Sequence, residues 1–248
     1  MTPESSAIAR FKDEIDLIVK MLPLDRPLDL VELGCGAAAT ARGLLGRFPD
    51  LQVTGIEVDR VQMEKNRAQT IPRLEFVEAG AQAIPFEAGR FDCAMMLKSL
   101  HHVPMPLMGK ALGEIARVVR TGGLLYVSEP CYGGAFNDIV RLYNDEGMVR
   151  AAAQGALDAA IAEPEPLWEQ IDEVRFTMPA RFENFDDFER KLMRPSYADH
   201  KLDAALVDRV REAFSPHQRA DGAHFVRLMH VRLLSRTAHP APAAADTH

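Results

Sequence analysis

The segment LVELGCGAAAT, residues 30–40, combines a tight glycine turn with an acidic residue at its entrance. Gly34 and Gly36, with Ala39 three residues further on, fit the G-x-G-x-x-G/A pattern of nucleotide-binding turns. Glycine removes the Cβ atoms that would keep the backbone away from a ligand. Glu32 lies two residues before the first glycine and brings a negative charge to the same place. The turn predicts a ligand site whose charge preference depends on Glu32.

A second carboxylate, Glu57, follows Gly36 by 21 residues and ends a β-branched segment. An acidic residue at this spacing accepts hydrogen bonds from the ribose hydroxyls of an adenosine ligand. The spacing suits a nicotinamide cofactor and an adenosyl cofactor equally, so Glu57 indicates adenosine without identifying the cofactor.

The charge of Glu32 distinguishes these two cofactors. A carboxylate ~5 Å from a diphosphate repels each negative charge by roughly 3 kcal/mol at an effective dielectric constant of about 20. A sulfonium or ammonium group is attracted by the same amount. The expected ligand is therefore cationic at one end and adenosine-like at the other, as S-adenosylmethionine is. Capping of the next helix, or pairing with a neighbouring lysine, is the alternative role for Glu32.

Glu32, Glu57 and the glycine turn can meet only if the fold brings the ends of their strands to the same edge of a sheet. The pattern of residues 25–130 predicts such a fold. Short apolar segments alternate there with helical ones, which is typical of right-handed βαβ units and a parallel sheet covered on both faces. The expected strands are 28–33, 51–58, 74–79, 91–97 and 124–130, and the expected helices are 7–22, 37–48, 60–70 and 106–120. Gly122 and Gly123 are expected to stop the last of these helices.

The alternation ends after Pro130. Residues 136–163 have a helical pattern, and so do 185–193 and 203–214, while 173–182 and 223–236 have strand character. The low-complexity segment 237–248 predicts a disordered tail.

Composition excludes several classes of function. The net charge of −7 over 248 residues opposes a nucleic acid as the main partner, because phosphate contacts need a surplus of Lys and Arg. No apolar run approaches the ~18 residues of a membrane span. The three cysteines are too scattered for a disulfide framework or a zinc site, so no metal is expected. With no signal-peptide pattern at the N-terminus, these features predict a cytoplasmic protein with reduced thiols. A monomer or homodimer is expected, although the sequence does not determine which.

With those residues placed, the chain resembles the class I S-adenosylmethionine-dependent methyltransferases, especially the branch that acts on small molecules. The resemblance covers about residues 28–130. It rests on VELGCG, VTGIEVD, AGAQAIPFEAGRFD, SLHHVP and EIARVVRTGGLLYVSEP, which occur in this order.

The resemblance implies an α/β fold: a Rossmann-like, seven-stranded, mostly parallel sheet with helices on both faces and a helical lid insertion after the fifth strand. It implies a single methyltransferase domain over residues 1–236, with an N-terminal helical cap at 1–24 and the lid at 131–170. The segments 173–179 and 224–234 would supply the last two strands.

The resemblance also implies roles for individual residues. Glu32 would help to hold the ammonium group of S-adenosylmethionine, and Glu57 would bind the ribose. The residues expected near the methionine moiety are Gly34, Cys35, Gly36, Leu97 and Lys98. The residues expected near the adenine are Val58, Gln62, Gly80, Ala81 and Gln82.

Two positions depart from the family pattern. The family usually has an aspartate, which accepts from the adenine amino group, where this chain has Gly80; Gln82 or a water molecule could replace it. A further glycine usually follows GCG, where this chain has Ala37 and Ala38. Both departures leave room for a weaker or altered cofactor site.

Residues for the acceptor are less constrained, because a sulfonium is already a strong electrophile and positioning supplies much of the rate. His102 is the favoured general base, if the acceptor holds its proton; packing against the cofactor loop is its alternative role. Lys98 could orient an anionic acceptor or face solvent. Candidate acceptor contacts, each with a structural alternative, are Tyr132, Asn137, Tyr143 and Arg194.

The predicted function is in-line SN2 methyl transfer from S-adenosylmethionine to a small-molecule acceptor, with S-adenosylhomocysteine as product and the acceptor atom left open. A non-catalytic S-adenosylmethionine-binding subunit is the main alternative, kept open by Gly80 and the alanine-rich turn. An NAD-dependent oxidoreductase is opposed by Glu32. An RNA methyltransferase is opposed by the net charge and by the lack of an N/D-P-P-Y-type tetrapeptide.

Overall fold

A computed structural model describes residues 9–69, 71–194 and 200–239 of the chain. The predicted tail lies, from residue 240 onwards, outside the described residues. No helix in the described part of the chain is long and apolar enough to cross a membrane.

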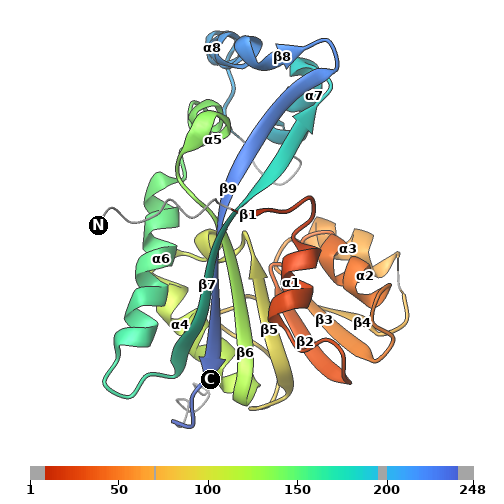
Figure 1. Ribbon diagram of the computed structural model, residues 1–248, viewed down its shortest axis with the longest axis vertical. Coiled ribbons are helices and arrows are strands. Elements are labelled where there is room, and N and C mark those ends of the chain that lie inside the picture. Colours follow the sequence, from red (N-terminus) through yellow and green to blue (C-terminus); the bar gives the residue numbers. More distant parts are fainter. Residues whose placement is uncertain (1–8, 70, 195–199, 240–248) are drawn as a thin grey trace. The chain divides into compact units, whose positions relative to one another are not determined.

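The strands form one sheet with the order β1-β7-β9-β6-β5-β2-β3-β4, and the short β8 pairs with β9 (Figure 1). Their bounds are β1 Ala9–Arg10, β2 Leu28–Leu33, β3 Leu51–Glu57, β4 Leu74–Glu78, β5 Phe91–Leu97, β6 Val119–Pro130, β7 Trp168–Phe182, β8 Gln218–Arg219 and β9 Gly222–Arg236. The pairs β2–β3, β2–β5, β3–β4 and β5–β6 are parallel, so β2, β3, β5 and β6 all end at the same edge. The mostly parallel Rossmann-like sheet is confirmed, and the two-residue strands β1 and β8 extend it.

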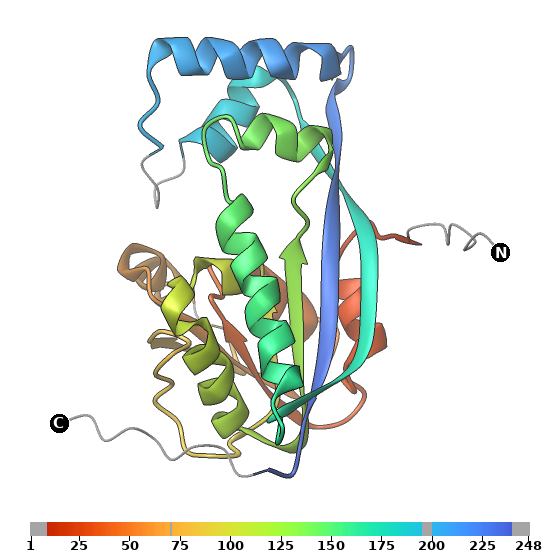
Figure 2. The same cartoon turned by 90° about the vertical axis from the view of Figure 1, so that its left-hand side faces the viewer.

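Helices cover both faces of the parallel sheet, as predicted. The helices of the whole described chain, including α5, α7 and α8 of a second core, are α1 Ile15–Met21, α2 Ala39–Leu45, α3 Arg60–Arg67, α4 Met108–Val118, α5 Gly134–Val140, α6 Gly147–Ala162, α7 Phe185–Phe188 and α8 Ala204–Phe214. Figure 2 shows α4 and α6 side by side on one face. Apolar residues of both helices, such as Leu112 and Leu157, share a core with strand residues such as Val31 and Val127.

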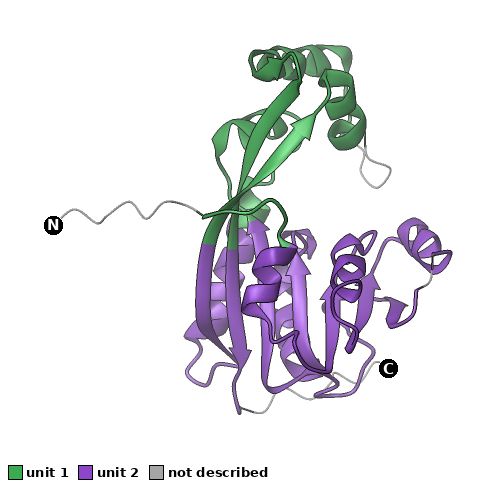
Figure 3. Ribbon diagram, turned by 45° about the vertical axis from the view of Figure 1, so that its right-hand side comes forward, with its two compact units in different colours: residues 1–14, 130–150, 175–230 green, residues 15–129, 151–174, 231–248 purple. Residues whose placement is uncertain are grey.

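The chain divides into two compact units (Figure 3). Unit 1 comprises residues 1–14, 130–150 and 175–230, and unit 2 comprises residues 15–129, 151–174 and 231–248. Unit 2 contains the parallel strands and the core just described. Unit 1 has its own aromatic core, to which Phe182, Phe185, Phe188, Phe214 and Phe225 contribute. The predicted division into one domain with a cap and a lid stays a prediction, although helices α5 and α6 do occupy the proposed lid segment.

Two expectations about the elements are wrong. The predicted helix 7–22 begins only at Ile15, because Ala9 and Arg10 pair with β7 and the Phe11 N–H donates to Thr177 O at 3.1 Å. Backbone used in strand pairing cannot also form a helix.

The second error concerns the glycines after α4. Gly122 and Gly123 do not stop this helix, which ends at Val118, but lie inside β6. A Cβ atom at Gly123 would meet Asp92 O at 2.5 Å, so glycine is needed there for close approach of two backbones. Gly122 has φ +74°, a conformation in which glycine carries no steric penalty.

Candidate cofactor site and catalytic residues

The turn after β2 contains three residues with left-handed backbone. Gly34, Gly36 and Ala38 have φ values of +67°, +50° and +53°. The Gly34 and Cys35 N–H groups both donate to Ile56 O of β3, at 2.8 and 3.1 Å. The turn is therefore fixed to the end of the neighbouring strand before any ligand binds.

Gly34 also allows the turn to contact the segment after β5. A Cβ atom at position 34 would lie 2.6 Å from Ser99 Cβ, which is too close for any side chain. Ser99 itself is buried, and its hydroxyl donates to Leu33 O at 2.7 Å. The predicted need for glycine at position 34 thus has a steric cause as well as a conformational one.

Glu57 lies against the glycine turn. Its Oε2 accepts from the Gly36 N–H at 2.8 Å, and its Oε1 accepts from the N–H groups of Val58 and Asp59 at 2.8 and 3.0 Å. The carboxylate is held in place by three backbone donors, and the Gly36 N–H is already engaged.

A polar side chain that was not among the predicted residues completes this arrangement. Asn66 of α3 is buried, and its Nδ2 donates to Gly36 O at 2.7 Å. Gln62, predicted to flank the adenine, donates from Nε2 to Asn66 Oδ1 at 2.9 Å. Val58, the other predicted flanking residue, is 66% exposed. An exposed valine can stack on an apolar ring, which is the role predicted for Val58.

The turn has a negative electrostatic environment. Glu32 is buried, with 3% of its surface exposed, in the last part of β2. Burial raises the pKa of the Cys35 thiol well above its ordinary range, and the charges of Glu32 and Glu57 raise it further, while Arg42 opposes them. Two carboxylates therefore act on the residue between the two glycines.

Gln82 occupies the space left by the missing side chain at Gly80. A Cβ atom at position 80 would lie 2.5 Å from Gln82 Nε2 and 2.6 Å from Oε1. The amide of Gln82 is thus folded over Gly80, while Ala81 between them is buried. That Gln82 replaces the usual aspartate stays a prediction.

The backbone conformation at the end of β5 determines where Leu97 and Lys98, the two residues predicted there, lie. Lys98 follows the buried Leu97, has φ +57°, and donates from its N–H to Ser128 O of β6 at 2.7 Å. The left-handed conformation turns the chain sharply at the strand end.

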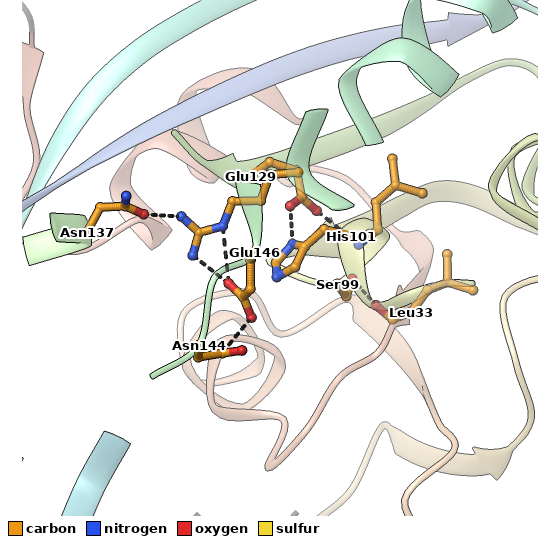
Figure 4. A network of polar contacts seen from close by, with 9 residues as sticks. Leu33, Ser99, His101, Glu129, Asn137, Asn144 and Glu146 are labelled. Atoms are coloured by element: carbon orange, nitrogen blue, oxygen red, sulfur yellow. Dashed lines mark hydrogen bonds and ion pairs between the residues drawn. The ribbon is translucent and has the colours of Figure 1, made fainter. Parts of the chain in front are cut away.

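A buried histidine–carboxylate pair follows this turn. His101 Nδ1 is in hydrogen-bond contact with Glu129 Oε2, and both side chains are at most 3% exposed (Figure 4). Glu129 Oε1 also accepts from the Leu100 N–H at 2.9 Å. His102, the favoured base, is exposed, and its ring is tilted by 42° against His101 with the centroids 4.1 Å apart. Glu129 was not predicted from the sequence.

The four candidate acceptor residues lie in unit 1, and they differ in environment. Tyr132 is 44% exposed, and Tyr143 packs edge-on against Phe188. Arg194 donates to Glu189 Oε1 at 2.8 Å in a largely exposed pair, which is the structural role weighed against ligand binding. Asn137 is buried and accepts at Oδ1 from Arg150 Nη1 at 2.8 Å.

Comparisons with known proteins agree with this geometry. A family model described as a methyltransferase domain matches residues 30–123. The 27-O-demethylrifamycin SV methyltransferase of Amycolatopsis mediterranei is 33% identical over 119 residues, which are 46% of this chain and 43% of that protein. The chain thus matches less than half the length of this curated relative.

Solved structures share the fold at low identity. The YcgJ protein of Bacillus subtilis has a TM-score of 0.62 at 15% identity and covers 91% of this chain and 99% of its own. The [4+2]-cyclase SpnF has a TM-score of 0.55 at 19% identity, with 91% of this chain and 81% of its own covered. The shared fold therefore includes a protein named for a different reaction.

Proposed function

Because residues 30–123 form a methyltransferase domain of the class I S-adenosylmethionine-dependent family, we propose that this chain transfers a methyl group from S-adenosylmethionine to a small-molecule acceptor. The observation that carries the proposal is the charge at the glycine turn. Glu32 and Glu57 both act on Cys35, so the turn favours a cation.

The hydrogen bonds of the turn support the same choice. A diphosphate bound at a glycine turn needs free backbone N–H donors. Here the Gly36 N–H donates to Glu57, and the Gly34 and Cys35 N–H groups donate to Ile56 O. An NAD-type ligand would have to break these bonds and approach two carboxylates, which disfavours the oxidoreductase alternative.

The chain's residues fit the parts of S-adenosylmethionine. Glu57 would accept from the ribose hydroxyls, and Glu32 would attract the ammonium group. The Gln82 amide would meet the adenine edge, with Val58 and Gln62 beside the ring. The remaining contacts, to the methionine moiety, would come from the backbone of Gly34, Cys35, Leu97 and Lys98.

The cofactor, when bound, supplies an electrophilic methyl group on a positively charged sulfur. An acceptor atom forms a bond to this carbon as the sulfur–carbon bond breaks in line, and the electron pair of that bond stays on sulfur. The role of the protein is to align the two reactants and to exclude water from them. A proton lost by the acceptor would pass to His102, which is exposed and held against the buried His101–Glu129 pair.

Titration calorimetry and labelled-methyl transfer test the proposal together. We expect binding of S-adenosylmethionine and S-adenosylhomocysteine, no binding of NADH, and transfer of label into a metabolite extract. Tight binding of NADH would contradict the assignment. Binding of the methyl donor with no transfer to any fraction of the extract would indicate the non-catalytic subunit instead.

Replacing Gln82 by alanine should weaken binding of the adenine moiety. Loss of one hydrogen bond to a buried polar group costs about 1–2 kcal/mol, or roughly a tenfold rise in Kd. Calorimetry with S-adenosylhomocysteine and its inosine analogue, which lacks the amino group, measures the effect. The substitution should reduce the preference for adenine, whereas an equal loss for both ligands would contradict this role.

Replacing His102 by glutamine should lower kcat about 100-fold if the acceptor holds its proton, because a positioned base contributes 10²–10⁴-fold. The Kd of the methyl donor should not change. The exposed His224, changed to glutamine, is the matched control. Unchanged kcat would exclude His102 as the base and leave it a packing role.

A further inference from the structure

Unit 1 contains a partly buried guanidinium group that the proposed methyl-donor site does not use. Arg227 lies on β9, with its guanidinium carbon 4.6 Å from the centre of the Phe136 ring. Its Nε atom is shielded from solvent and has no hydrogen-bond partner among the described residues. Burial lowers the pKa of Arg227, and the charge of Arg150 lowers it further.

The charges around Arg227 do not balance within unit 1. Arg150, whose charge lowers the pKa of Arg227, is itself a cation and cannot balance it. Glu146 accepts from Arg150 Nη2 at 2.6 Å and from Nε at 3.2 Å, so its charge is engaged by Arg150 (Figure 4). Within the described part of the chain, Arg227 therefore has no ion-pair partner.

A second buried donor belongs to the same group of residues. Asn137 Oδ1 accepts from Arg150 Nη1 at 2.8 Å, which leaves the Nδ2 group as the donor. This Nδ2 atom is shielded from solvent and has no hydrogen-bond partner within residues 9–69, 71–194 and 200–239. Arg150 thus bonds Asn137 and acts through its charge on Arg227, and both Arg227 Nε and Asn137 Nδ2 lack an acceptor among the residues that the structure describes.

Such an arrangement is costly unless an anion completes it. Moving an unpaired charge out of water costs several kcal/mol of folding free energy. Leaving a buried hydrogen-bond donor without an acceptor costs about 1–3 kcal/mol. A guanidinium group binds a carboxylate or phosphate through two parallel hydrogen bonds. The stacked Phe136 ring would hold the plane of the guanidinium while leaving its edge for the ligand.

We propose that unit 1 binds an anionic group, a carboxylate or phosphate, at Arg227 and Asn137.

Anion binding is tested first, with the full chain and no methyl donor. Citrate and inorganic phosphate, the two probes, should each raise the unfolding temperature above that in chloride at equal ionic strength. A response to citrate alone would identify a carboxylate ligand, and a response to phosphate alone a phosphate ligand. Both responses should disappear in Arg227→Gln and persist in Arg209→Gln, an exposed arginine of the same unit. Equal shifts in both variants would mean an adventitious ion only and would overturn the proposal.

A second variant guards against a simple folding defect. Asn137→Asp places a carboxylate beside the two arginines and should act as an internal anion. We expect it to raise the unfolding temperature in chloride and to abolish the response to citrate and phosphate. A lowered unfolding temperature with the response intact would overturn the assignment of Asn137.

Discussion

Replacing Glu32 by glutamine is expected to raise the Kd of S-adenosylmethionine about 100-fold. A carboxylate ~5 Å from an ammonium group contributes roughly 3 kcal/mol at an effective dielectric constant of about 20. The amide keeps the size of the side chain but loses this attraction.

Calorimetry with three ligands makes the test specific. S-Adenosylmethionine and S-adenosylhomocysteine both carry the ammonium group and should both bind more weakly to Glu32→Gln. Methylthioadenosine lacks this group and should bind as it does to the unchanged protein. Glu57→Ala should weaken all three, because each has the ribose, and Glu75→Gln, on the exposed side of β4, should weaken none. An unchanged Kd for S-adenosylmethionine in Glu32→Gln would count against the methyl-donor assignment.

Replacing Gly34 by alanine is expected to destabilise the fold by roughly 3 kcal/mol. The left-handed conformation costs a residue with a Cβ atom about 1–2 kcal/mol, and overpacking against Ser99 costs about 1–3 kcal/mol more. The new Cβ would lie 2.6 Å from Ser99 Cβ, so one of the two segments must move. The unfolding temperature should fall by roughly 10 °C, since each kcal/mol lowers it by about 2–4 °C in a chain of this size.

Gly36→Ala is the matched control, because Gly36 shares the left-handed conformation but a Cβ atom added there would meet no other atom within 4 Å. It should lower the unfolding temperature by only about 3–6 °C. Ser99→Gly, combined with Gly34→Ala, should recover about 1–2 kcal/mol relative to the sum of the single changes. Strict additivity would show that the contact with Ser99 is not the cause.

The strand segments of residues 25–130 and the glycine turn could be predicted because their signals are local. Glycine spacing and an acidic residue at a strand end follow from what one turn requires, and Glu57 does contact Gly36. The predicted helix at residues 7–22 failed for the opposite reason: β1 pairs with Phe176 and Thr177, which are far away in the sequence. Periodicity within a segment cannot show that its backbone is used by a distant strand.

The site residues that were not predicted show the same limit. Glu129 is a charged residue in the apolar segment LLYVSEP, just as Glu32 is in LDLVEL. The position of Glu32 beside the glycine turn predicts a role in ligand binding. Glu129 has no glycine motif beside it in the sequence, so nothing local predicts its contact with His101. Asn66, by contrast, gives no signal on its helix, because its partner is a backbone oxygen of the turn 30 residues earlier.

The thiol of Cys35 shows a further effect of the two carboxylates. A thiolate is a far stronger nucleophile than a thiol. Beside a methyl donor it would capture the reactive carbon and leave the enzyme S-methylated. Burial, Glu32 and Glu57 keep Cys35 protonated. The acidic surroundings that we propose to attract the donor would thereby also protect the protein from alkylating itself.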